Sequence, residues 1–292
     1  MNNSSLQNGL TLQSNNRCFY GEQRYYQHQS AVTKSVMTFS VYLPDAAIVG
    51  HDCPAILYLS GLTCNTDNVT HKAHFQQLCS ELGVIFIAPD TSPRGENVAD
   101  DEQFFIGQAA SYYVDATCEP WAEHYQMQSY IVEELYDLIH AQFPISSLGL
   151  MGHSMGGHGA LMLGFKFADK FASVSAIAPA CVASQSQKGQ AAYQAYFGED
   201  KAVWQQHDAI YAIWQAGQQY VSILVDQGQE DEFYQAGQLQ TQKLQQVCCE
   251  VKQPLTIRYH AGYDHGYYFI QTVMADHITH HLHAANLLVD DR

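Results

Sequence analysis

A serine flanked by glycines stands at residue 154, where a short apolar run gives way to small residues. Residues 152–156 read Gly-His-Ser-Met-Gly, and they follow the apolar run 148–151. A strand that turns into a helix within one residue strains that residue's backbone, and side chains at the two glycines would collide with the turn. The spacing predicts a nucleophile elbow, a turn that presents the Ser154 hydroxyl for attack on an acyl carbon.

Ser154 needs two partners, because a serine hydroxyl is a weak nucleophile at neutral pH. A histidine must accept its proton, and a carboxylate must orient that histidine. His265 follows the apolar run 255–259 and precedes a helical segment, which is the expected place for the base. Two other histidines, His153 and His158, are expected to pack beside the elbow and to be structural.

The acid is expected after the apolar run 221–225, where residues 226–232 carry four carboxylates. Asp226 lies close to the end of the predicted strand. Asp231 directly precedes the next helical segment, and it is expected to lie nearer to the loop that carries His265. Spacing alone leaves the choice of acid open.

Two backbone N–H groups must also face the tetrahedral oxygen. One belongs to Met155, the residue after the nucleophile, and the other to the loop Ser60-Gly61-Leu62-Thr63-Cys64, where Leu62 is the best candidate. These amides form the predicted oxyanion hole.

The elements that must position these groups alternate along the chain. Residues 35–43 alternate in the manner of a half-buried antiparallel strand. Continuous apolar runs typical of buried strands cover 55–59, 84–88, 148–151, 173–177, 221–225 and 255–259, and helical spacing covers 69–82, 129–143, 154–167, 233–248 and 267–287. This alternation predicts an α/β fold, with a mostly parallel central sheet flanked by helices on both faces. Most of these strands should be buried on both faces. Ligands then bind beyond the carboxyl ends of the strands, where the aromatic-rich segment 89–128 is expected to wall the pocket.

Composition narrows the class of partner. The chain of 292 residues has 13 basic and 29 acidic residues, and its net charge of -16 disfavours nucleic acid and anionic membranes. No apolar run is long enough to span a membrane, and no secretory signal is visible. Eight cysteines without a C-x-x-C pair indicate reduced thiols and a cytoplasmic protein. We expect one domain over 18–292, a polar extension over 1–17, and a small-molecule substrate.

Six segments in order resemble the S-formylglutathione hydrolase family, also called esterase D. The resemblance runs from about Cys18 to His281. Its motifs are Ser-Gly-Leu-Thr-Cys at 60–64, Ala-Pro-Asp-Thr-Ser-Pro-Arg-Gly at 88–95, Tyr-Val-Asp-Ala-Thr at 113–117, the elbow at 152–161, Asp-Gln-Gly at 226–228, and Gly-Tyr-Asp-His at 262–265 with Tyr-Phe-Ile at 268–270.

The resemblance implies an α/β-hydrolase fold and hydrolysis of S-formylglutathione to formate and glutathione. It implies a triad of Ser154, Asp231 and His265, because the family's acid is the second of the acidic pair after Asp-Gln-Gly. It also implies that Cys64 lies beside the site and makes the enzyme thiol-sensitive without being the nucleophile. No metal or cofactor is expected, and members are often homodimers. The nearest alternative is a general short-chain carboxylesterase or thioesterase.

Two segments depart from the family pattern, both in loops on the catalytic side. Residues 186–189 read Ser-Gln-Lys-Gly where Cys-Pro-Trp-Gly is usual, which places Lys188 at the tryptophan position. Residues 107–112 are poorer in glycine than is common. Because glutathione carries two carboxylates, Lys72, Arg94 and Lys188 are candidate substrate cations. Asp276, His277, His280, His281 and His283 have spacing that suggests metal ligands, but we expect them to form the polar face of a terminal helix.

Overall fold

A central sheet runs through the whole molecule. The structure is a computed structural model that describes residues 9–290, with side chains described as far as residue 285. Within these residues the sheet has nine strands in the order β1-β2-β3-β5-β4-β6-β7-β8-β9. The strands are β1 (Thr11–Cys18), β2 (Gly21–Gln29), β3 (Val36–Leu43), β4 (Cys53–Leu59), β5 (Ile85–Pro89), β6 (Ile145–His153), β7 (Ser173–Ile177), β8 (Ile223–Gly228) and β9 (Leu255–His260).

The first three strands are antiparallel, and β3 meets β5 antiparallel. From β5 to β9 every pairing is parallel, so the carboxyl ends of β4 to β9 lie at one edge. The predicted mostly parallel sheet is confirmed.

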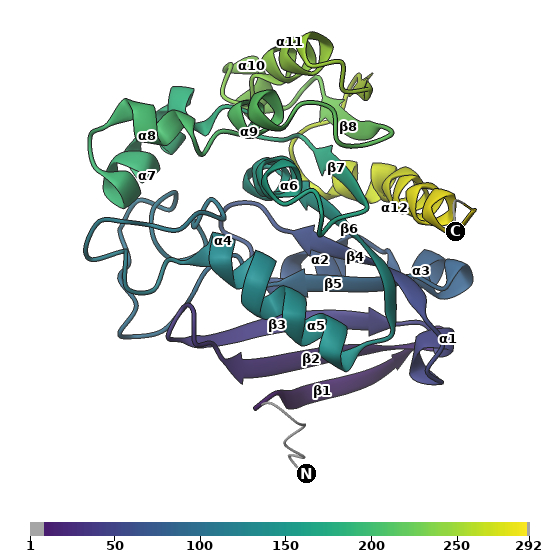
Figure 1. Ribbon diagram of the computed structural model, residues 1–292. Coiled ribbons are helices and arrows are strands. Elements are labelled where there is room, and N and C mark those ends of the chain that lie inside the picture. The colour runs from purple at the N-terminus through teal and green to yellow at the C-terminus, as the bar shows by residue number, and fades with distance from the viewer. Residues whose placement is uncertain (1–8, 291–292) are drawn as a thin grey trace.

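Helices cover both faces of the sheet, as predicted (Figure 1). One face is covered by α4 (Met127–Ser129), the π-helical turn η1 (Tyr130–Leu135), α5 (Tyr136–Gln142), α6 (Met155–Lys166), α9 (Ala209–Ala216) and α11 (Thr241–Glu250). The other is covered by α2 (Thr66–Lys72), α3 (Gln76–Leu82) and α12 (Tyr267–Asp290). The remaining helices are α1 (Asp45–Ile48), the 3₁₀ turn η2 (Ala183–Gln185), α7 (Gln187–Phe197), α8 (Lys201–Gln205) and α10 (Glu232–Gln235).

The central strands are continuously apolar because both of their faces are buried. In β4, Leu57 and Leu59 join the core cluster under α6, whereas Ile56 and Tyr58 join the cluster under α12. Side chains of a strand alternate between faces, so each face receives every second residue. The edge strand β9 is different, because its residues are only partly buried or exposed. The expected burial on both faces is therefore wrong for this strand.

Two predicted helices are each interrupted. The segment 69–82 divides into α2 and α3 at His74, whose φ of 54° ends the first helix, and the following Phe75 stacks on Phe86 with ring centroids 3.9 Å apart. The segment 233–248 divides into α10 and α11, with positive φ at Gly237 and Gln240 between them. Helices α7, α8 and α9 and strands β1 and β2 had no counterpart in the sequence prediction.

The N-terminal boundary also differs from the expected one. The sequence predicts a polar extension over 1–17, whereas Thr11–Cys18 pairs with β2 as the outermost strand of the sheet. Because this edge strand is exposed over most of its length, it carries polar residues, and its sequence resembles that of a polar extension. Residues 1–8 lie outside the described part of the chain.

The histidines of α12 do not form a polar face, which corrects the prediction. His277 and His281 are buried, and only His283 of the four is exposed. The two ring nitrogens of His281 bond to Ser173 Oγ at 2.6 Å and Ser175 Oγ at 2.8 Å, so this ring ties the helix to β7. No group of three or more His, Cys, Asp or Glu side chains among the described residues could hold a metal ion.

Among the helices of the described residues, none combines the length and apolar character needed to cross a membrane. All eight cysteines are unpaired, and five of them are buried.

Candidate active site

Ser154 stands between the end of β6 and the first residue of α6, with φ 58° and ψ -118°. The neighbouring glycines make this turn possible. A Cβ on Gly152 would lie 2.0 Å from the Gly156 carbonyl oxygen, and one on Gly156 would lie 1.9 Å from the Leu59 carbonyl oxygen. The backbone N–H of Ser154 donates to Ile177 O at 3.0 Å, which fixes the serine to β7. The local sequence therefore forms the predicted elbow, and its strain holds the hydroxyl above the sheet edge.

A continuous chain of hydrogen bonds links three of the predicted site residues. His265 Nε2 lies 2.8 Å from Ser154 Oγ, and His265 Nδ1 lies 2.5 Å from Asp231 Oδ2. Asp231 and His265 come from the loops after β8 and β9, two adjacent parallel strands, so their side chains meet at the same sheet edge. This geometry allows proton transfer from the serine to an imidazole oriented by a carboxylate.

Asp231 is fully buried and its carboxylate has several donors. Its Oδ1 accepts from the backbone N–H groups of Phe233 at 2.8 Å and Tyr234 at 3.1 Å, and its Oδ2 also accepts from Gln227 Nε2 at 3.1 Å. Burial acts to raise the pKa of Asp231, but the hydrogen bond from His265 and these further donors outweigh burial and lower it. Asp231 therefore stays ionised beside His265.

Asp226, the other acid that spacing left open, is bound elsewhere. It lies opposite Arg258 in the β8–β9 register, accepts from Arg258 Nε at 2.7 Å and Nη2 at 2.5 Å, and contacts His260 at 2.8 Å and His277 at 2.9 Å. Burial would raise the pKa of Asp226, but hydrogen bonds from His277 and Arg258 lower it well below its usual range. These contacts direct the Asp226 oxygens at β9 and α12, away from the hydrogen bonds between Ser154, His265 and Asp231.

The loop 60–64 passes directly against the elbow. A Cβ on Gly61 would lie 3.2 Å from Ser154 Cβ, and Leu62, Met155 and Ser154 line one cavity. The Leu62 N–H donates to no acceptor in the described part of the chain, and Met155 opens α6, where amides have no intrahelical partner. Both predicted oxyanion donors are thus placed beside the nucleophile.

The loop 60–64 is held by the segments that the sequence singled out. Arg94 binds Asp90 through Nε at 2.8 Å and Nη2 at 2.9 Å, and the same Nη2 donates to Cys64 O at 2.9 Å. Thr91 Oγ1 also donates to Cys64 O at 2.6 Å, and Tyr113 Oη donates to Ser60 O at 2.8 Å. Both ends of the loop are therefore fixed by side chains from distant segments.

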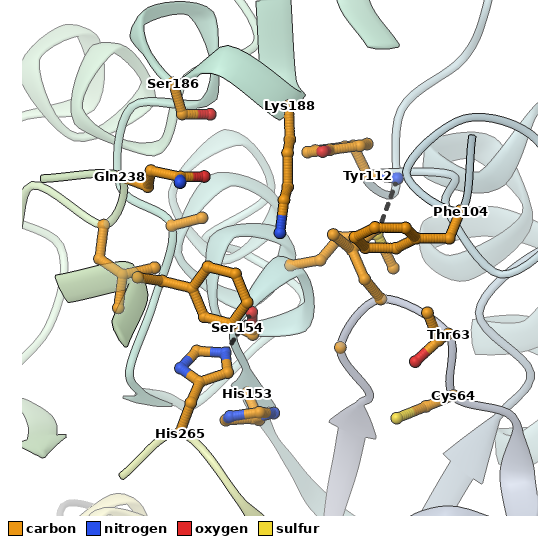
Figure 2. A pocket seen from close by; sticks show the side chains of 16 residues that line it. Thr63, Cys64, Phe104, Tyr112, His153, Ser154, Ser186, Lys188, Gln238 and His265 are labelled. Atoms are coloured by element: carbon orange, nitrogen blue, oxygen red, sulfur yellow. Dashed lines mark hydrogen bonds between the residues drawn. The ribbon is translucent and has the colours of Figure 1, made fainter. Parts of the chain in front are cut away.

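A cavity of about 210 Å³ opens over Ser154 (Figure 2). Its walls are mostly apolar, and two of them, Phe104 and Tyr112, come from the segment 89–128. His153 also lines it, with its ring centroid 4.6 Å from that of His265. Neither ring nitrogen of His153 has a partner among the described residues, and burial followed by the proximity of His265 lowers its pKa well below the usual value. His153 thus packs beside the elbow, as predicted, and its neutral ring also forms part of the cavity wall. By contrast, His158 is buried in the core beside Tyr193.

Cys64 is buried at one side of this cavity, 3.6 Å from Tyr267 Oη. Burial raises the pKa of its thiol, and the hydrogen bond to Tyr267 and the charges of Lys72 and Arg94 offset part of that rise. The thiol lies beside the site but outside the hydrogen-bonded chain of Ser154, His265 and Asp231.

Only one of the three candidate substrate cations lines the cavity. Arg94 is bound to Asp90, and Lys72 lies over the ring of Tyr267, 5.3 Å from its centroid, outside the cavity lining. Lys188 alone of the three lines the cavity.

Sequence reasoning missed the residues that hold the site residues in place. Gln227 bonds to Asp231, and Thr91 and Arg94 hold the loop of Leu62. Their segments were noted for the family resemblance, but no local pattern relates them to the triad. These contacts join residues from 4 to 30 positions apart, and only the folded arrangement of the loops brings them together.

Comparison with known proteins shows which proteins this chain resembles over most of its length. The family described as "Putative esterase" matches residues 30–280. An S-formylglutathione hydrolase of Mus musculus is 45% identical over 271 residues, which cover 92% of this chain and 96% of that protein. An S-formylglutathione hydrolase of Paracoccus denitrificans (strain Pd 1222) is 45% identical over 270 residues, covering 92% and 95%.

Solved structures show the same likeness. An S-formylglutathione hydrolase from Agrobacterium tumefaciens superposes with a TM-score of 0.90 at 41% identity, covering 94% of this chain and 99% of that one. The fluorophosphonate-binding serine hydrolase FphF of Staphylococcus aureus superposes with a TM-score of 0.71 at 20% identity, covering 89% and 97%, a likeness of fold alone. The expected α/β-hydrolase fold is confirmed.

Proposed function

The chain belongs to the S-formylglutathione hydrolase family of esterases, and we propose that it cleaves S-formylglutathione to formate and glutathione through a formyl ester on Ser154. The observation that carries this mechanism is the hydrogen-bonded chain from Asp231 through His265 to Ser154 at the floor of a small apolar cavity. Serine, imidazole and carboxylate at these distances suit acyl transfer.

In the first half of the reaction, Ser154 Oγ attacks the formyl carbon while its proton passes to His265 Nε2. The Leu62 and Met155 amides stabilise the oxyanion, and the N-terminus of α6 adds its positive dipole end. The tetrahedral intermediate then collapses, the C–S bond breaks, and His265 returns the proton to the departing sulfur. A thiolate leaves readily, because the pKa of a simple thiol is about 8.5.

In the second half, water replaces glutathione in the cavity. His265 takes a proton from this water as its oxygen attacks the formyl ester, and the same amides hold the second oxyanion. Collapse breaks the bond to Ser154 Oγ, which recovers the proton from His265, and formic acid leaves and releases its remaining proton to solvent to give formate. Asp231 remains a carboxylate throughout and stabilises the imidazolium formed in each half.

Acyl-chain length provides the test of substrate class. We expect kcat/KM to be highest for S-formylglutathione and to fall as the acyl group is lengthened to acetyl, propionyl and butyryl, because the acyl group must share a cavity of about 210 Å³ with the thiol part of the substrate. Purified protein would be assayed by loss of thioester absorbance, with p-nitrophenyl acetate alongside. A rate that rises with acyl length, or faster turnover of p-nitrophenyl acetate than of S-formylglutathione, would favour a general short-chain esterase instead.

The Ser154→Ala variant is the control for the mechanism in the same assay. We expect its turnover to fall at least about 10⁴-fold, because the nucleophile is absent. Ser146→Ala, an exposed serine in the same strand, should retain full activity. Retained turnover in Ser154→Ala would remove this residue from the mechanism.

We propose the cytoplasm as the location, supported by eight unpaired thiols, since oxidising compartments favour disulfides. The family resemblance further predicts a homodimer, which light scattering of the purified chain would test.

A further inference from the structure

The cavity over Ser154 holds one formal charge besides its histidines. Its lining is largely apolar, with Leu62, Phe104, Met155 and Phe233 among its walls. Among the described residues that line it, Lys188 is the only lysine, arginine, aspartate or glutamate. An ammonium in an apolar cavity loses part of its hydration, so its position there needs a reason.

The Lys188 side chain is held in the cavity by a fixed helix start. Ser186 caps α7 by accepting from the Gly189 N–H at 3.1 Å, and a Cβ on Gly189 would lie 2.1 Å from Ala183 O, so the turn is closely packed. Figure 2 shows Lys188 extending from this turn with Nζ directed into the cavity toward Ser154. Nζ lies 4.1 Å from the ring centroid of Phe233 and 4.8 Å from that of Phe104.

No carboxylate of the described residues forms an ion pair with Lys188. Burial lowers the pKa of its ammonium, whereas the more distant charge of Glu232 acts to raise it. Cation–π contacts with two rings retain the charge in the cavity, yet leave the N–H groups free to donate to an incoming acceptor. This arrangement fits an anion supplied by a ligand.

The ammonium faces the part of the cavity that a leaving group must use. The Phe233 ring that contacts Lys188 also packs edge-on against His265, with centroids 4.7 Å apart. His265 delivers the proton to the departing sulfur, so the leaving group lies on its side of the cavity. A formyl group has a single carbon, and it leaves most of the remaining space to the thiol part of the substrate.

We infer that Lys188 is a specificity-determining residue that binds a carboxylate of the glutathione leaving group. This inference rests on the proposed function for its choice of ligand. Of the three cations that the sequence put forward, Arg94 is bound to Asp90 and Lys72 lies outside the cavity, so neither is placed to do this.

The first test uses S-methylglutathione, which carries both carboxylates but cannot be hydrolysed. Its inhibition constant is measured with p-nitrophenyl acetate as reporter substrate. Lys188→Gln should raise this constant about 10-fold, and Lys188→Arg should keep it within about threefold of wild type, as expected for a charge-assisted hydrogen bond. The matched control is Lys170→Gln, because Lys170 lies 4.2 Å from the Tyr136 centroid in a similar contact outside the cavity.

The second test removes the charge from the ligand instead. For wild type, the diethyl ester of S-methylglutathione should bind about 10-fold more weakly than the free acid. For Lys188→Gln, the ester and the free acid should bind about equally weakly. An unchanged inhibition constant in Lys188→Gln, or an equal loss on esterification in both proteins, would overturn the inference. Absence of S-formylglutathione turnover in wild type would instead reject the proposed function, since this inhibition assay does not depend on that reaction.

Discussion

At the scale of single residues, two buried aspartates five positions apart have different partners. Asp231 accepts from His265 and from the start of α10, whereas Asp226 is surrounded by Arg258, His260 and His277. Both carboxylates have lowered pKa values, so ionisation alone does not distinguish them. Their partners do, because only Asp231 reaches the imidazole beside Ser154.

Substitution of the two aspartates by asparagine should therefore separate catalysis from stability. Asp231→Asn should lower kcat about 10⁴-fold, the cost of this change in another serine hydrolase, while the fold persists. Asp226→Asn should instead reduce the free energy of unfolding by about 2 kcal/mol, because the charge-assisted bonds to the buried carboxylate are lost, while Arg258 keeps Asp276 as an exposed partner. Steady-state kinetics and urea denaturation of both variants measure this. Comparable kcat losses in both would contradict the assignment.

Cys64 provides a second prediction at this scale. Its raised pKa keeps most of the thiol protonated at neutral pH, and only the thiolate is alkylated. We expect iodoacetamide to slow hydrolysis without abolishing it, at an inactivation rate that still rises above pH 9, beyond the usual thiol pKa of about 8.5. Cys64→Ser should resist the reagent, whereas exposed Cys249→Ser should behave as wild type. Wild-type sensitivity in Cys64→Ser would clear this thiol of involvement.

At the scale of elements, the site is assembled by loops that other loops hold. The loop 60–64, which carries the proposed donor Leu62, lies outside helices and strands, and its carbonyl groups are fixed by Arg94, Thr91 and Tyr113. The bidentate pair of Arg94 with Asp90 orients the guanidinium, so we expect Arg94 to position the Leu62 amide, the proposed oxyanion donor.

Removing the Arg94 contacts with Asp90 and the Cys64 carbonyl should destabilise the transition state more than the substrate complex. We expect Arg94→Gln to lower kcat about 10-fold, with a smaller change in KM. This loss in kcat is smaller than the loss of about 10² to 10³-fold that follows removal of an oxyanion donor. Arg94→Lys should fall between the two proteins, because it keeps the charge but loses the bidentate geometry. A rise in KM with unchanged kcat would show that Arg94 binds substrate rather than positioning the loop.

At the scale of the whole molecule, several histidines are held neutral inside the fold. Burial lowers the pKa of His158 to about 3 and those of His207 and His280 to about 4. A histidine with a lowered folded-state pKa contributes its full stability above pH 6.5, and that stability is lost as pH falls toward the folded value. Asp208 acts in the opposite sense, because burial raises its pKa to about 6.

The protein should consequently lose stability between pH 6.5 and pH 5. At pH 5, His158 alone accounts for a loss of about 2 kcal/mol, and Asp208 offsets only about 1 kcal/mol of the combined loss. Urea denaturation at pH 7.5 and pH 5 measures the difference, and His158→Gln should show a smaller one. Equal stability at both pH values would contradict the neutral burial of these rings.

Sequence by itself determined the features set by neighbouring residues. The elbow at Ser154, the mostly parallel direction of the central strands and the position of His265 after β9 were predicted from the sequence, because strand and turn preferences act over a few residues. The helices α2 and α3 were predicted as one, because periodicity does not register that Phe75 turns inward against Phe86.

Only the tertiary structure decided which charged groups meet. Pairing of β8 with β9 puts Asp226 opposite Arg258 and leaves Asp231 in the following loop to meet His265. The α12 histidines look solvent-facing in sequence, yet packing buries two of them against β7 and β8. The physical reason is that electrostatic and hydrogen-bond partners are fixed by register and burial, which depend on residues far apart in the chain.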